Sequence, residues 1–120
     1  MSKKLVKLKQ DTDVIEAIKM MLNHKITSAP VMTEQGTLAG MFSEKDSMKV
    51  VLESAYNQGM SGKVADFMTE ETISVEADTS ILELAETFKS STVRSFPVYD
   101  DGDLVGVISR SDVLRALTSL

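Results

Sequence analysis

Gly106-Val107-Ile108-Ser109-Arg110-Ser111-Asp112 repeats, late in the chain, the pattern of Gly40-Met41-Phe42-Ser43-Glu44-Lys45-Asp46. Both stretches begin with glycine and an apolar pair, continue with serine, and end on aspartate three residues after that serine. An apolar run that passes directly into Ser-x-x-Asp is typical of a strand followed by the start of a helix. The two stretches therefore predict the same strand-to-helix junction at two places in the chain.

The repeat extends outward from these junctions. Ala29-Pro30-Val31 and Gly36 precede the first junction, and Phe96-Pro97-Val98 and Gly102 precede the second with one residue fewer before the glycine. Self-similarity in a constant order indicates two copies of one supersecondary unit. We expect the copies to superpose, with Pro30 and Pro97 at equivalent positions, each at a strand start or edge because proline cannot donate to a β-ladder.

Each copy has the pattern strand, helix, strand, strand, helix. Apolar residues at three- and four-residue spacing predict the helices, and the start signals are Asp13 with Glu16 and Ser80 with Glu83. Gly36 and Gly102 are suited to the tight turns of the two hairpins. The expected elements are strands at 4–8, 29–32 and 38–42 with helices at 14–22 and 48–55, and their counterparts at 71–75, 96–99, 104–108, 81–88 and 113–117.

The fold class is therefore α/β (α+β), with two tandem β-α-β-β-α units. A unit of this size cannot cover two amphipathic helices and a small sheet alone, so we expect the copies to pack about a pseudo-twofold axis with a cleft between them. The predicted domains are residues 1–58 and 63–120. Residues 56–62 contain two glycines and show no periodicity, which is typical of a linker.

Composition excludes several classes of protein. The 120 residues contain no cysteine, which rules out disulfides and thiolate chemistry and agrees with a cytoplasmic location. No apolar run is long enough to span a membrane. The net charge of -5 argues against nucleic-acid binding, which requires neutralisation of phosphates. The only histidine, His24, falls late in a predicted helix, and we expect no enzyme active site.

The second junction carries chemistry suited to a nucleotide. Ser109, Ser111 and Asp112 place two hydroxyls and a carboxylate at a helix start, where backbone N–H groups favour anions. Hydroxyls bind phosphate or sugar, and a carboxylate accepts hydrogen bonds from both hydroxyls of a ribose. Ser109-x-x-Asp112 is also a capping box, which stabilises a helix by about 1 kcal/mol without any ligand. These residues alone are compatible both with a nucleotide site and with a helix cap.

The wider pattern resembles a known family. Phe67-Met68-Thr69, Thr72-Ile73-Ser74-Val75, Arg94-Ser95-Phe96-Pro97-Val98 and the Gly106–Asp112 junction are together similar to a cystathionine-beta-synthase (CBS) domain. The first copy resembles another, so that nearly the whole chain looks like a CBS domain pair, or Bateman module. The resemblance implies a regulatory module that senses an adenosine-containing ligand: AMP, ADP, ATP or S-adenosylmethionine. It implies no covalent cofactor and no metal.

The resemblance also implies roles for single residues. Asp112 would hold the ribose hydroxyls, Ser109 and Ser111 would contact ribose or phosphate, and Arg94 would pair with phosphate. The residues that would wall the base are Thr72, Ile73, Pro97, Val98 and Val107. We refer to these nine residues as the second half-site. Family members commonly form disk-shaped dimers, which implies a homodimer that reports nucleotide or energy status to a regulated protein.

The first copy departs from this pattern. Ser43 and Asp46 retain the first hydroxyl and the carboxylate, but Lys45 stands where Ser111 stands, and Thr27 replaces Arg94. We refer to Ser43, Lys45 and Asp46 as the first half-site and expect it to bind ligand more weakly. The alternative to a ligand sensor is a structural module with empty clefts that dimerises or docks a partner.

Overall fold

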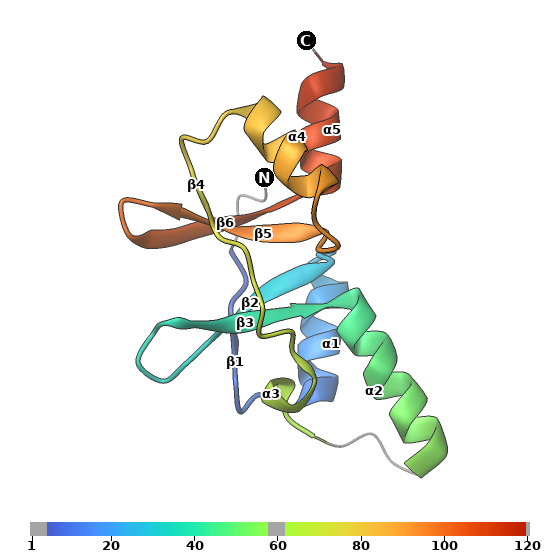
Figure 1. The fold of residues 1–120 in the computed structure, drawn as a ribbon. Helices are drawn as coiled ribbons and strands as arrows, with labels where there is room; N and C mark the ends of the chain where they lie inside the picture. Colours follow the sequence, from blue (N-terminus) through green and yellow to red (C-terminus); the bar gives the residue numbers. More distant parts are fainter. Residues whose placement is uncertain (1–4, 58–61, 120) are drawn as a thin grey trace. The chain divides into compact units, whose positions relative to one another are not determined.

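The computed structural model describes residues 5–57 and 62–119. They form two compact units, one of residues 6–71 and another that begins at Thr72 and includes Leu5 (Figure 1). Each unit contains a three-stranded sheet in which a short parallel strand and a longer antiparallel strand flank a central strand. The predicted duplication of strand, helix, strand, strand and helix is confirmed.

The first unit also contains one element that the repeat did not predict. This is α3, which lies between the copies in the sequence and contributes Val64 to the core of the first unit. The elements of the first unit are β1 (Leu8–Lys9), α1 (Val14–Asn23), β2 (Ser28–Met32), β3 (Leu38–Ser43), α2 (Glu44–Asn57) and α3 (Val64–Phe67).

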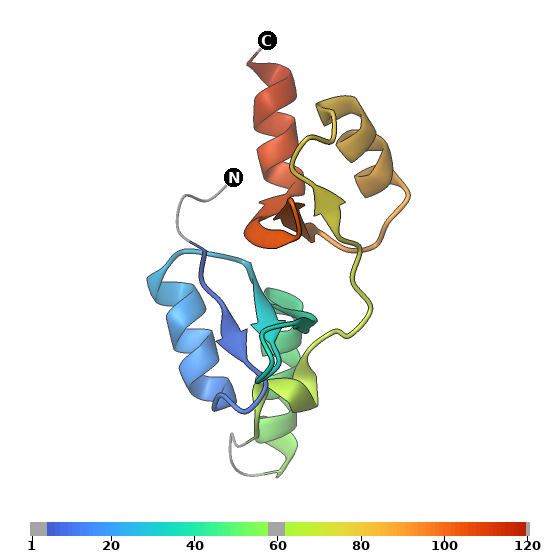
Figure 2. The ribbon, with the colours of Figure 1, turned by 90° about the vertical axis from the view of Figure 1, so that its left-hand side faces the viewer.

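The second unit repeats the first five of these elements in the same order. They are β4 (Val75–Glu76), α4 (Ile81–Lys89), β5 (Ser95–Asp100), β6 (Asp103–Ser109) and α5 (Arg110–Thr118). Figure 2 shows β1 and β4, each beside the hairpin of its own unit. The side chains of Asp13 and Ser80 cap the first helix of each unit as expected, by accepting hydrogen bonds from backbone N–H groups.

Strand register shows that the copies are equivalent. Pro30 lies opposite Met41, as Pro97 lies opposite Val107. Both hairpins contain an irregularity at the same place, after Val31 and after Val98. Gly36 and Gly102 have φ values of 84° and 85°, which confirms that glycine serves the two tight turns.

The prolines correct one expectation. Like Pro97, the third residue of the central strand β5, Pro30 is the third residue of the central strand β2 rather than a strand start or an edge. Met41, its partner on β3, directs its backbone N–H and C=O to Thr69 instead of to β2. The proline nitrogen therefore points to the β1 side, where β1 pairs only with Val31 and Met32. No ladder bond is lost at proline because β1 is so short.

Predicted boundaries also change at two strands and at the linker. The strands expected at 4–8 and 71–75 begin later, at Leu8 and Val75, and have only two residues each. The predicted linker at 56–62 overlaps α2, which continues through Asn57, and its residues 58–61 lie outside the described part of the chain.

The core of each unit lies between its sheet and its two main helices. In the first unit Val14, Ala17 and Met21 of α1 pack with Val50 of α2 and with Phe42, which is fully buried. In the second unit, the rings of Phe88 and Phe96 stack with centroids 4.1 Å apart, beside Leu84 and Val113. This packing fixes the strand-to-helix junction at one end of each sheet.

Candidate functional site: two strand-to-helix junctions

The second junction forms the predicted capping box. Ser109 ends β6 and is the N-cap of α5. Its backbone N–H and its hydroxyl donate to Oδ2 of Asp112 over 2.8 and 2.9 Å, and its hydroxyl oxygen accepts from the backbone N–H of Asp112 at 3.2 Å. The junction therefore holds a carboxylate in a defined orientation at the start of a helix.

Arg115, one helical turn further on, binds the other oxygen of this carboxylate. Its Nη2 lies 2.7 Å from Oδ1 of Asp112, while its side chain is 72% exposed and that of Asp112 is 18% exposed. Burial alone would raise the pKa of Asp112, but hydrogen bonds from the backbone and hydroxyl of Ser109 and from Arg115 outweigh it, so that the pKa is lowered. Asp112 is a charged acceptor near neutral pH.

The structure places Arg94 and two of the wall residues beside this junction. The backbone C=O of Arg94 accepts a hydrogen bond from the N–H of Arg110, so that the residue before β5 adjoins the first turn of α5. Arg94 itself is exposed. Pro97 and Val107 are cross-strand partners on β5 and β6.

The other members of the second half-site differ in their surroundings. Val98 follows Pro97 and is buried, and Ser111 is exposed on the first turn of α5. Thr72 and Ile73 precede β4, and no described contact links them to Asp112. Their roles stay predictions.

The first junction has the same geometry at its serine and aspartate. The backbone N–H and hydroxyl of Ser43 donate to Oδ2 of Asp46 over 2.9 and 3.0 Å, and Lys49 Nζ lies 3.1 Å from Oδ1. Lys49 is the counterpart of Arg115. Lys45 is exposed and has no described contact with this carboxylate. Both copies thus place a cation three residues after the aspartate.

Burial distinguishes the two carboxylates. The side chain of Asp46 is 1% exposed, against 18% for Asp112. Asp46 also receives a hydrogen bond from the hydroxyl of Thr69, which lies 3.1 Å from Oδ1 and 3.4 Å from Oδ2. The carboxylate of Asp46 is therefore contacted by a residue 23 positions away in the sequence.

Sequence reasoning missed Lys49, Arg115 and Thr69. The two cations had a readable signal, because they occupy equivalent positions in the two copies. Thr69 belongs to the Phe67-Met68-Thr69 pattern that carries the family resemblance, but its contact with Asp46 could not be predicted because it depends on the path of the chain after α3. Among the described residues, no group of side chains is arranged to hold a metal ion, and none of the described helices is long and apolar enough to cross a membrane.

Comparison with known proteins confirms the resemblance to CBS domains. The family model for the CBS domain matches residues 1–53 and again residues 64–119, so the chain belongs to the CBS domain family and contains two CBS domains. The CBS-domain containing protein ATU1752 from Agrobacterium tumefaciens has a similar structure, with a TM-score of 0.85 and 27% identity over 97% of this chain and 86% of that one.

Two further relatives extend the comparison. The mitochondrial CBS domain-containing protein CBSX3 of Arabidopsis thaliana is 32% identical over 89% of this chain, which spans 53% of that protein's length. The structure of CBSX2 in complex with AMP matches with a TM-score of 0.79 and 27% identity over 97% of this chain and 89% of that one.

Proposed function

We propose that this CBS domain pair is a regulatory module that binds an adenine nucleotide, chiefly through the second half-site, and communicates its occupancy to a partner protein. The observation that carries the proposal is the carboxylate of Asp112, which is ionised, partly exposed and oriented at a helix start. A ribose diol supplies the hydroxyl donors that such a carboxylate accepts. The AMP complex of the related CBSX2 supports an adenosine ligand.

The cations nearby favour a phosphorylated ligand. Arg94 adjoins the start of α5, and the exposed guanidinium of Arg115 lies against Asp112. Since guanidinium groups pair well with phosphate, either side chain is suited to a nucleotide phosphate. We propose AMP, ADP or ATP before S-adenosylmethionine, which carries no phosphate. The regulatory role implies a binding protein rather than an enzyme, and a cytoplasmic location stays a prediction.

The structural alternative has one observation in its favour. The hydrogen bonds between Ser109 and Asp112 form a complete capping box, which stabilises α5 without a ligand. A module with empty half-sites would retain this box. The two functions differ in whether any nucleotide stabilises the fold.

A thermal-shift screen separates them. AMP, ADP, ATP, S-adenosylmethionine and NAD are each added to the purified chain at millimolar concentration. A ligand present at about 100 times its dissociation constant stabilises the folded protein by roughly 2.7 kcal/mol, which raises the melting temperature by several degrees. Stabilisation by the phosphorylated compounds supports the sensor, and no stabilisation by any of them supports the structural module.

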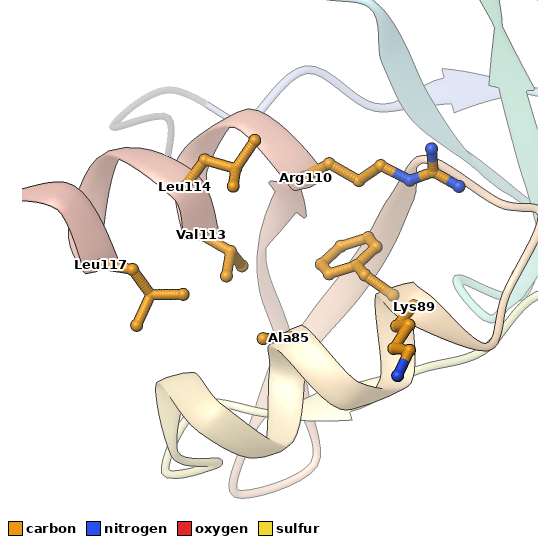
Figure 3. A pocket seen from close by; sticks show the side chains of 7 residues that line it. Ala85, Lys89, Arg110, Val113, Leu114 and Leu117 are labelled. Carbon is orange, nitrogen blue, oxygen red and sulfur yellow. The ribbon is translucent and has the colours of Figure 1, made fainter.

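We also propose a homodimer. Between α4 and α5 lies an apolar groove of about 290 Å³, with Lys89 and Arg110 among its lining side chains (Figure 3). The large apolar side chains Met48, Leu52 and Tyr56 of α2 are 62%, 59% and 83% exposed. Exposed apolar faces of this kind mark interaction surfaces.

Charge indicates which faces meet. Glu44 stands in the first copy where Arg110 stands in the second. In the proposed dimer, the face formed by α1 and α2 of a second chain packs on the groove between α4 and α5, which brings Glu44 toward Arg110. Pairing of like faces would instead bring equal charges together. A twofold axis repeats the contact, which closes the dimer.

A further inference from the structure

The chain supplies its own hydroxyl donor to the first half-site. Thr69 Oγ1 donates to the carboxylate of Asp46, at 3.1 Å from Oδ1 and 3.4 Å from Oδ2. A ribose hydroxyl would approach the same two oxygens with the same kind of donor. Thr69 is thus chemically a substitute for one ligand hydroxyl.

The remaining acceptor positions of Asp46 are also used. Oδ2 accepts the backbone N–H and the hydroxyl of Ser43, and Oδ1 lies 3.1 Å from Lys49 Nζ. The side chain is 1% exposed. A diol therefore cannot pair with this carboxylate while Thr69 stays in place.

The backbone around Thr69 is docked by specific contacts. Thr69 and Met41 exchange two backbone hydrogen bonds, of 2.8 and 2.9 Å, which form an isolated bridge and hold the segment 67–71 at the open edge of β3 through Thr69. A Cβ atom on Gly40 would lie 2.5 Å from the carbonyl oxygen of Thr69, so only glycine permits this approach. The second unit begins at Thr72, directly after the docked segment.

We propose that Thr69 is an internal competitor that keeps the first half-site closed to nucleotide for as long as the segment 67–71 is docked on β3. The proposal rests on the proposed function in that the excluded ligand is an adenine nucleotide. Capture of a nucleotide by Asp46 then requires release of the segment that enters the second unit. Occupancy of the first half-site is therefore coupled to the connection between the two copies.

The first test needs no ligand. Amide hydrogen exchange is measured at Met41 and Thr69 in the unmodified chain and in Thr69→Ala, Thr69→Ser and Thr37→Val. Loss of one hydrogen bond to a charged acceptor should speed exchange at these two amides by about tenfold in Thr69→Ala, while Thr69→Ser retains the hydroxyl and the slow rate. Thr37→Val removes a hydroxyl that bonds Thr33, away from Asp46, and serves as the matched control. Unchanged exchange in Thr69→Ala overturns the proposal, whether or not the protein binds nucleotide.

The second test measures AMP binding by calorimetry in a background with the second half-site disabled. Asp112→Ala alone should bind AMP weakly, and Asp112→Ala with Thr69→Ala should regain at least tenfold in affinity as the first half-site opens. Adding Asp46→Asn should abolish the gain. A double variant that binds no better than Asp112→Ala contradicts competition by Thr69. By contrast, failure of the unmodified chain to bind any nucleotide contradicts the proposed function, and the exchange measurement then decides on Thr69 alone.

Discussion

Arg115 Nη2 lies 2.7 Å from Oδ1 of Asp112, and the equivalent cation of the first copy, Lys49, lies 3.1 Å from Oδ1 of Asp46. The duplicated junction therefore includes a cation one turn into the helix as well as the serine and the aspartate. Burial is what differs between the copies, because the side chain of Asp46 is 1% exposed and that of Asp112 is 18% exposed. This difference leads to opposite expectations for the two aspartates in stability and in binding.

Asp46→Ala should destabilise the protein more than Asp112→Ala. Removing Asp46 deprives Ser43, Lys49 and Thr69 of an acceptor in a buried position, which costs roughly 3 kcal/mol. Removing Asp112 costs about 1 kcal/mol, the usual value of a helix cap. Urea unfolding followed by circular dichroism measures both, with Asp103→Ala, at the exposed first residue of β6, as the control. Equal losses of unfolding free energy in the two variants would show that burial of Asp46 does not increase its contribution to stability.

The junctions show how far the sequence alone leads. The capping residues Asp13, Ser80 and Ser109 were predicted because their hydrogen bonds span only two or three residues. β1 and β4 were predicted too early, since apolar residues before Leu8 and Val75 suggested strands that the structure does not form. The position of Pro30 in a central strand depends on the length of a neighbouring strand, and that of Thr69 on a contact across 23 residues. Neither the strand position of Pro30 nor the contact of Thr69 with Asp46 can be predicted from the residues adjacent to it in the sequence.

Acid should reveal the ionisation of Asp112. Its pKa is lowered in the folded protein, so its contribution to stability is present above the unfolded pKa of about 4 and is lost as the pH falls through the folded value. Asp112→Asn keeps a similar shape without the charge. Thermal unfolding between pH 6 and pH 2.5 should therefore show the advantage of the unmodified chain over Asp112→Asn shrinking with acid. Parallel curves for the two proteins would mean that this carboxylate is not stabilised as a charge.

Arg94→Ala should selectively weaken the binding of ligands that contain a phosphate. If the guanidinium meets a phosphate, AMP loses a charge-assisted pair worth roughly 1.5–3 kcal/mol, and adenosine loses nothing. Calorimetry with both ligands gives the ratio directly, and Arg110→Ala, which alters the neighbouring exposed cation, is the comparison. Equal weakening of AMP and adenosine would place Arg94 away from the phosphate.

The dimer is tested by charge reversal. Sedimentation at micromolar protein should show twice the mass of the 13.1 kDa chain. Glu44→Arg and Arg110→Glu should each weaken association, because each places like charges in the contact, and the two together should restore it. A protein that sediments as a monomer both with and without nucleotide would contradict the proposed dimer. If the single reversals leave the dimer intact, the faces that meet are not the ones proposed.

The most direct test of the nucleotide sensor is calorimetric titration of AMP into the unmodified chain, Asp112→Ala and Asp46→Ala. Loss of the charged partner of a ribose should cost Asp112→Ala one to two orders of magnitude in affinity. Asp46→Ala should retain nearly the affinity of the unmodified chain wherever it stays folded, because Asp46 is buried and engaged by Thr69. The same affinity in all three proteins would contradict the assignment of the second half-site.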